Sequence, residues 1–124
     1  MNLVDTSGWL EYFANGANAG FFASAIEKVD ELIVATVTVY EVFRRVVEQR
    51  GEDDALRAVA AMQQARVVEL STKIALGAGR LGVANHLGAA ECQVLATAQA
   101  FGAVLWTQDP AFEGMRDVRF KARR

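Results

Sequence analysis

The sequence predicts an α/β domain whose parallel sheet is covered by helices on both faces. Short apolar runs of four or five residues alternate along the chain with segments in which apolar residues recur at helical spacing. The short runs are largely apolar, without a regular polar alternation, which is typical of strands buried on both faces of a parallel sheet. A length of 124 residues suits one domain and is short for two, so we expect a single domain over residues 1–124.

In the first half of the chain, turn-forming and helix-starting residues mark the boundaries of the elements. The first apolar run stops at Asp5, and Thr6 and Ser7 after it favour a helix start. Asn15 and Gly16 are typical of the end of that helix. The predicted elements are a strand at 2–5, helices at 7–14 and 18–29, a strand at 32–36, and helices at 38–49 and 53–64.

The second half repeats the alternation of strands and helices. A third apolar run precedes Ser71, which favours a helix start, and Ile74 and Leu81 then follow at helical spacing. The predicted elements are a strand at 67–70, a helix from 71, a connection at 83–88, a helix at 88–102, a strand at 103–106, a turn at 107–112 and a small edge strand at 118–120.

The overall charge limits how the chain could bind a polyanion. Thirteen basic residues against fifteen acidic ones give a net charge of −2. This charge excludes a histone-like polycation, so nucleic-acid binding would depend on local basic patches or on metal ions. The single cysteine, Cys92, excludes an intrachain disulfide and fits a reducing compartment. No apolar run approaches the roughly 18 residues of a membrane span, so we expect a cytoplasmic protein with no membrane partner.

Four acidic residues fall where a parallel sheet gathers the carboxyl ends of its strands. Asp5 ends the first strand, Glu41 lies in the first turn of the helix after the second strand, and Asp109 follows the fourth. Glu91 lies in the first turn of the helix that leads into the fourth strand, which places it near Asp109. Ligands of open α/β sheets bind at this edge, so we expect the four carboxylates to converge there.

Helix capping is an alternative interpretation for three of these acids. Asp5 could cap the helix that follows it. Asp109 precedes Pro110, a pattern typical of a cap followed by proline at the first helical position. Glu41 follows Thr38 at the spacing of a capping box.

Ion pairing is the other alternative, and it concerns the two glutamates. Glu41 could pair with Arg44 or Arg45 at helical spacing. Glu91 shares its helical face with apolar residues, so a solvated position does not explain it. A buried pair with Arg80 or Arg45 could account for its charge.

The four acids together indicate a metal site. Four carboxylates in one cleft would repel one another, and the pKa of at least one would rise unless a cation neutralised them. Oxygen ligands of this kind suit Mg²⁺ or Mn²⁺. Such a site can activate water and stabilise the charge that develops when a phosphodiester is cleaved.

Three segments make the sequence similar to a known family. They are LVDTSGWLEYF at residues 3–13, TVTVYEVFRR at 36–45 and AAECQVLATAQAFGAVLWTQDPAF at 89–112. In their order and spacing, these segments resemble a PIN-domain ribonuclease, in particular the toxin of a VapBC-type toxin–antitoxin pair. The resemblance implies a PIN-like three-layer α/β/α domain with a central parallel sheet of four to five strands.

The resemblance also assigns roles to individual residues. By position, it implies that the four acids form the catalytic, metal-binding quartet. It implies supporting roles for the hydroxyls of Thr6, Ser7 and Thr107, although helix capping explains the first two equally well. The family usually has aspartate where this chain has Glu91. The extra methylene puts the number of bound metal ions in question.

The function implied by the resemblance is that of an endoribonuclease toxin dependent on Mg²⁺ or Mn²⁺. A cognate VapB-like antitoxin would neutralise it, and we expect a homodimer. Two alternatives stay open: a PIN nuclease in RNA processing that is not a toxin, and a catalytically silent PIN-like binding module.

Several arginines are candidates for contacts with RNA phosphates. Arg44 and Arg45 follow Glu41, while Arg116 and Arg119 belong to the basic tail MRDVRFKARR, for which a solvated terminus is the default interpretation. The helices predicted within 18–29 and 38–64 could also offer apolar grooves to a partner helix or to a second copy of the chain.

Overall fold

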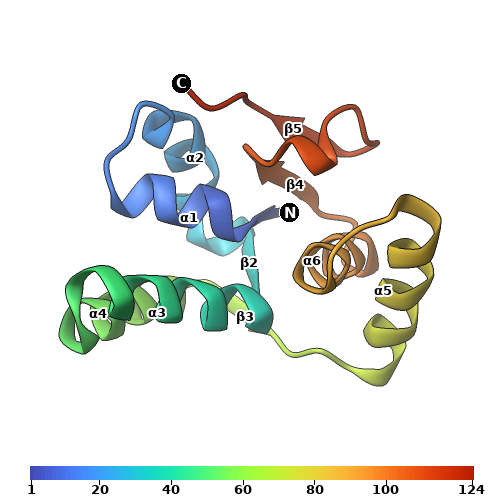
Figure 1. The fold of residues 1–124 in the computed structure, drawn as a ribbon, viewed down its shortest axis with the longest axis horizontal. Helices are drawn as coiled ribbons and strands as arrows, with labels where there is room; N and C mark the ends of the chain where they lie inside the picture. Colours follow the sequence, from blue (N-terminus) through green and yellow to red (C-terminus); the bar gives the residue numbers. More distant parts are fainter.

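In the computed structural model, which describes residues 1–124, five parallel strands form one sheet in the order β3-β2-β1-β4-β5 (Figure 1). The chain moves outward from β1 to β2 and β3, then crosses back to β4 and β5 on the other side of β1. The reversal places a topological switch point between β1 and β4, where open α/β sheets bind ligands. The strands are β1 (Asn2–Val4), β2 (Leu32–Ala35), β3 (Arg66–Val68), β4 (Val104–Thr107) and β5 (Val118–Phe120).

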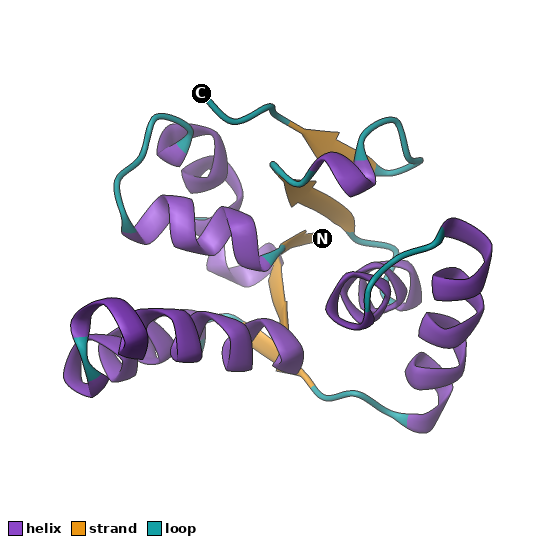
Figure 2. Ribbon diagram, in the orientation of Figure 1, coloured by secondary structure: helices purple, strands orange, loops and turns teal.

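Helices cover both faces of the sheet, as the largely apolar strands predict (Figure 2). Alternate strand residues face opposite ways, so Val4 packs into one core and Leu3 into the other. The first core lies beneath α1 (Thr6–Phe13), α2 (Ala19–Ile26), α3 (Thr36–Arg50) and α4 (Glu52–Met62). The second lies beneath α5 (Thr72–Asn85) and α6 (Ala89–Ala100). The predicted three-layer α/β/α fold is therefore confirmed, with five strands.

α1 is packed directly onto the sheet, and a glycine makes this possible. A Cβ atom at Gly8 would lie 2.5 Å from Cγ1 of Val4 and 2.6 Å from the ring of Phe22. The close approach fixes the first turn of α1 against the end of β1. The residues of that turn consequently have a defined position at the carboxyl edge of the sheet.

Some predicted boundaries are wrong. α3 begins at Thr36, two residues earlier than predicted, so Thr38 is inside the helix and does not cap it. Its hydroxyl is buried without a hydrogen-bond partner. Residues 83–85 belong to the last turn of α5, which ends at His86 in the left-handed conformation with φ of 55°. The second helix stops at Ile26 and a 3-10 turn, Val29–Glu31, leads into β2.

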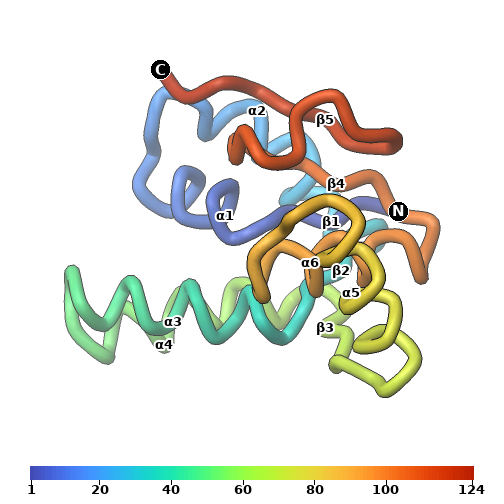
Figure 3. The backbone as a smooth tube through the Cα atoms, turned by 45° about the vertical axis from the view of Figure 1, so that its right-hand side comes forward, coloured from blue at the N-terminus to red at the C-terminus, as the bar shows by residue number.

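The helical layers are unequal in shape. α3 and α4 pack side by side and extend together beyond the sheet, whereas α5 and α6 lie against its other face (Figure 3). The C-terminus lies near α1 and α2, on the same side of the molecule as the carboxyl ends of β1 and β4 (Figures 1 and 3). No helix is both long enough and apolar enough to span a membrane.

Candidate active site

Asp5 is the buried centre of the site. It caps α1, and its Oδ1 accepts hydrogen bonds from the Gly8 N–H at 3.0 Å and from the Ser7 hydroxyl at 2.7 Å. Its Oδ2 accepts from the Thr107 hydroxyl at 2.6 Å, and the residue is only 5% exposed. Burial raises the pKa of Asp5, and so does the charge of Asp109, against three hydrogen bonds that lower it. The capping interpretation holds, yet the three hydrogen bonds do not offset the effect of burial on the pKa of this carboxyl.

The turn after β4 places a second acid next to Asp5. Asp109 caps the short 3-10 helix η2 (Pro110–Phe112), where its Oδ1 accepts from the Ala111 N–H at 3.0 Å. The hydroxyl of Thr107 accepts from the Asp109 N–H at 2.9 Å while it donates to Asp5. One hydroxyl therefore fixes the position of two acids, and the predicted cap before Pro110 is confirmed.

Glu91 lies beside Asp109, as the antiparallel course of α6 relative to β4 predicts. The hydrogen bond that it shares with Asp109 raises the pKa of Glu91, and partial burial and the charges of Asp109 and Asp5 raise it further. The N–H of Gly88 donates to its Oε1 at 2.9 Å, which acts in the opposite direction and caps α6. Neither Arg80 nor Arg45 forms an ion pair with it. The sequence-based interpretation omitted the capping role of this residue.

Glu41 joins the site through a hydroxyl. Its Oε1 accepts from the Thr6 hydroxyl at 2.6 Å, and Thr6 is the residue after Asp5. The predicted pair with Arg44 does not form, because Arg44 donates to Glu48 at 3.2 Å and to the hydroxyl of Tyr40 at 3.1 Å. All three predicted supporting hydroxyls, those of Thr6, Ser7 and Thr107, thus bond to one of the four acids.

The donor set fits a hard divalent cation in its chemistry. The acids offer only oxygen atoms, none of them forms an ion pair with an arginine or lysine, and the pKa of two of them is raised. In this arrangement, however, no three acidic, histidine or cysteine side chains stand close enough together to hold a metal ion. The carboxylates meet in pairs. Glu91 shares a hydrogen bond with Asp109, and the Thr107 hydroxyl bonds to both Asp109 and Asp5. The Thr6 hydroxyl donates to Glu41.

The candidate arginines lie in different places. Arg45 lines a groove beside Ser7. Arg119 lies with its guanidinium carbon 4.4 Å from the ring centroid of Trp106, so it stacks on the first core. Arg116 precedes β5 and therefore lies at the amino edge of the parallel sheet, opposite the acids. The structure therefore places Arg116 away from the four acids.

Two amides were missed by the sequence analysis. Gln108 is 2% exposed, its backbone N–H donates to the Ser7 hydroxyl at 3.3 Å and its side chain donates to the Ser7 carbonyl at 3.4 Å. Asn18 is 1% exposed and donates to the side-chain carbonyl of Gln108 at 3.0 Å. The only signal in the sequence is the position of Gln108 between Thr107 and Asp109, and nothing marks Asn18.

The fold is shared with several solved structures. A toxin–antitoxin complex from Klebsiella pneumoniae aligns with a TM-score of 0.81 at 22% identity, covering 96% of each chain. The sarcin–ricin loop cleaving toxin VapC20 of Mycobacterium tuberculosis aligns with a TM-score of 0.76 at 19% identity, covering 96% of this chain and 99% of that one. A DNA-bound VapBC from Salmonella typhimurium aligns with a TM-score of 0.76 at 14% identity, covering 98% of both.

No curated protein sequence matches the chain. The family model described as the PIN domain matches residues 3–118. This stretch contains all four acids and all five strands, apart from Asn2 of β1 and the last two residues of β5. The match covers nearly the whole chain and agrees with the five-stranded parallel sheet. The chain belongs to the PIN domain family.

Proposed function

We propose that this protein is a metal-dependent endoribonuclease toxin of the VapC kind, acting in the cytoplasm and neutralised by a cognate VapB-like antitoxin. The observation that carries the proposal is a chain of contacts between acids at the switch point of the sheet: Thr107 bonds to both Asp5 and Asp109, and Glu91 shares a hydrogen bond with Asp109. Glu41 bonds to Thr6, the residue after Asp5. No cation of the chain compensates this charge. Toxin–antitoxin proteins among the structures of the same fold support the biological assignment.

The four acids would hold the cation, Mg²⁺ or Mn²⁺. A bound cation would lower the pKa of a coordinated water and neutralise charge on the phosphate that is attacked. Asp5 is the fixed ligand, because Ser7, Gly8 and Thr107 all bond to it. Glu91 is the candidate acceptor for the proton of the attacking water, because it is only partly buried and lies beside Asp109.

Cleavage of RNA tests this proposal. The purified protein is incubated with total cellular RNA in Mg²⁺, in Mn²⁺ or in EDTA, and the new ends are mapped. We expect cleavage at defined positions only with a divalent cation, and no cleavage by Asp5→Asn. Equal cleavage by wild type and Asp5→Asn would contradict the proposed mechanism, and no cleavage by either would favour the silent binding module.

Expression in a host cell separates the toxin from a housekeeping nuclease. We expect wild type to arrest growth, Asp5→Asn to be harmless, and co-expression of a small neighbouring reading frame to restore growth. A nuclease that cuts RNA but does not impair growth would instead be the RNA-processing enzyme that the sequence left open.

The proposed partners require an exposed apolar surface, and α3 and α4 offer one. A groove of about 430 Å³ lies between them, lined mostly by apolar side chains, and Tyr40 and Leu56 at its border are 58% and 52% exposed. An antitoxin helix or a second copy of this chain would bury these side chains. Light scattering of the protein alone measures the expected dimer, and a monomer would remove that part of the proposal.

A further inference from the structure

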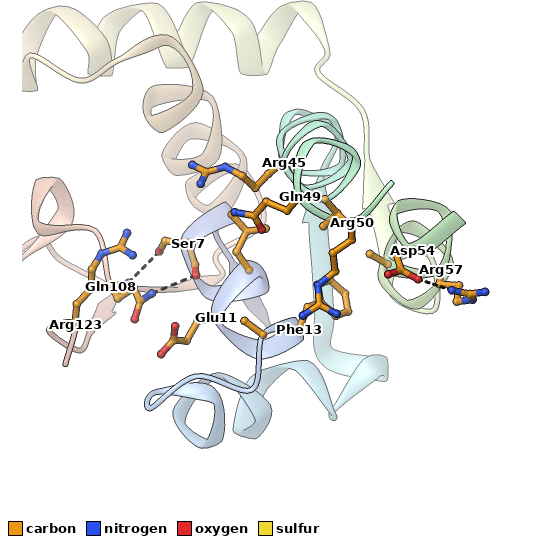
Figure 4. Close-up of a pocket in the computed structure, with 14 residues that line it drawn as sticks. Ser7, Glu11, Phe13, Arg45, Gln49, Arg50, Asp54, Arg57, Gln108 and Arg123 are labelled. Carbon is orange, nitrogen blue, oxygen red and sulfur yellow. Dashed lines mark hydrogen bonds and ion pairs between the residues drawn. The ribbon is translucent and has the colours of Figure 1, made fainter. Parts of the chain in front are cut away.

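A polar groove of about 560 Å³ opens at the candidate active site (Figure 4). α1 and α3 both begin at the carboxyl edge of the sheet, and side chains of these two helices, such as Glu11 and Gln49, line the groove. Ser7 lies at the end next to the acids, where its hydroxyl donates to Asp5 at 2.7 Å. From Ser7 to Ala14 the groove follows α1 for about 10 Å, given the rise of a helix. None of the four acids lines the groove, but a strand bound in it would pass Ser7, which bonds to Asp5.

Positive charge is concentrated in this groove. It holds four arginines and two acids, a local excess of two positive charges in a chain whose net charge is −2. One arginine, Arg57, forms an ion pair with Asp54, and the carboxylate of Glu11 accepts from a backbone N–H of the loop before α2 at 2.8 Å. The three remaining arginines are exposed and have no carboxylate partner: Arg45, Arg50 and Arg123.

The C-terminal tail contributes one of these arginines, and a buried amide holds it there. The side chain of Asn18 donates to the carbonyl of Ala122 at 2.9 Å and to Gln108 at 3.0 Å. Gln108 in turn donates to Ser7, so the tail is connected to the residue that bonds to Asp5. Figure 4 shows Arg123 beside Gln108 and Ser7, at the end of the groove that meets the site.

We propose that this groove binds the phosphates of single-stranded RNA next to the bond that is cut, through Arg45, Arg50 and Arg123. The proposal rests on the proposed ribonuclease function. The acids alone would repel a polyanion, and a guanidinium is suited to bind phosphate by two parallel hydrogen bonds. Polar side chains outnumber apolar ones in the groove, which favours a nucleic-acid strand over an apolar helix.

Binding of a labelled single-stranded RNA of mixed sequence in EDTA tests the groove without cleavage. Dissociation constants are measured from about 50 to 400 mM KCl for wild type, for R45Q, R50Q and R123Q singly, and for the triple variant. Each lost phosphate contact lowers the slope of log affinity against log salt by about 0.7. We expect the triple variant to lose about two units of slope and to bind at least roughly tenfold more weakly at low salt.

R116Q is the matched control, because Arg116 is 96% exposed and lies at the opposite edge of the sheet. R116Q loses one positive charge, as each single variant does, and should keep the wild-type slope of log affinity against log salt. Thermal unfolding of each variant confirms that the exposed substitutions leave the fold intact. A triple variant that binds RNA like R116Q, or a wild type that does not bind this RNA at all, would overturn the proposal.

Binding of an acidic peptide tests the other possible occupant of the groove, an acidic protein segment. If the triple variant loses affinity for a labelled oligoglutamate peptide and keeps its affinity for RNA, the groove binds an acidic protein segment and the proposal is wrong. The cleavage assay with Asp5→Asn is independent of both results. If wild type cleaves RNA and the triple variant binds RNA as tightly as wild type, only the proposal for the groove is rejected. If the triple variant loses salt-dependent binding but wild type does not cleave RNA, only the proposed nuclease function is rejected.

Discussion

Asp5 and Glu91 are two acids of one site, and the fold holds them in opposite ways. Asp5 is buried and accepts three hydrogen bonds from the chain, two of them from hydroxyls of Ser7 and Thr107. Glu91 is only partly buried, accepts one backbone hydrogen bond and has another carboxyl, Asp109, as its neighbour. The pKa of each is raised, chiefly by burial for Asp5 and chiefly by the shared hydrogen bond for Glu91.

The two acids therefore differ in what fixes the geometry of the side chain. The geometry of Asp5 is determined by the fold, so Asp5 is ready to act as a ligand before anything binds. Glu91 is held by the Gly88 N–H at 2.9 Å and by a hydrogen bond with Asp109, and this second contact requires a proton on one of the two carboxyls. In the proposed mechanism, Asp5 would be the pre-positioned ligand of the cation, and Glu91 and Asp109 would supply further carboxylate oxygens.

The largest effect is expected when the fixed acid is changed. Asp5→Asn keeps the size of the side chain and removes the charge, so the cation loses its buried ligand. A metal site supplies several kcal/mol of transition-state stabilisation, and we expect initial rates of RNA cleavage to fall by at least roughly 10³-fold. Unfolding curves of the variant in EDTA serve as the control for folding, and a rate within tenfold of wild type would contradict the assignment.

A change at the second acid should have a smaller effect. Glu91→Gln removes one charge from a half-buried pair in which Asp109 remains, so we expect a loss of roughly 10²-fold in cleavage rate. Glu91→Asp keeps the charge, carries the residue usual in the family, and should retain cleavage within about tenfold. If Gln and Asp variants lose activity equally, the charge of this residue is not what the site uses.

The hydroxyl that links two acids should have the next largest effect. Thr107→Val keeps the shape of the side chain, but it removes the donor to Asp5 and the acceptor for the Asp109 N–H. A hydrogen bond to a charged group contributes about 1.5–3 kcal/mol, so cleavage should fall by roughly 10- to 100-fold. Thr107→Ser restores both contacts and should restore most of the rate, and failure to do so would indicate a packing defect.

The smallest effect concerns the pH dependence of stability in EDTA. Because the pKa of Glu91 is raised in the folded state, the native chain binds more protons than the unfolded chain as pH rises above the ordinary glutamate value of 4.5. The free energy of unfolding therefore receives a contribution from Glu91 that decreases with rising pH over that window. Glu91→Gln removes this contribution, so denaturant unfolding from about pH 4 to 8 should show wild type losing stability relative to the variant. A constant difference between them would contradict the raised pKa.

The parts of the molecule that follow from local patterns were predictable. Strands buried on both faces give purely apolar runs, so β2 and β4 were found within one residue at each end. The four acids were found because the carboxyl ends of parallel strands meet at one edge. Topology brings them to one edge, where they meet in pairs, even though three of them alone resemble helix caps.

Other parts depend on contacts that no local pattern contains. α3 starts before Thr38 because packing buries this residue, and its N-cap, Ala35, offers no side-chain hydrogen bond that would mark the start. The link from Asn18 to Gln108 joins residues 90 positions apart. The position of Arg123 depends in turn on that link, so the basic groove could not be inferred from the composition of the tail.

Binding of Mn²⁺ measured by titration calorimetry tests the central claim most directly, because it does not require an RNA target. We predict that wild type binds Mn²⁺, that Glu91→Gln binds it more weakly, and that Asp5→Asn does not bind it measurably. Wild type should also unfold at a higher temperature in excess Mn²⁺ than in EDTA, since a ligand that binds the native state stabilises it. Equal Mn²⁺ affinity in wild type and Asp5→Asn would show that these carboxylates do not hold the cation, and would contradict the account.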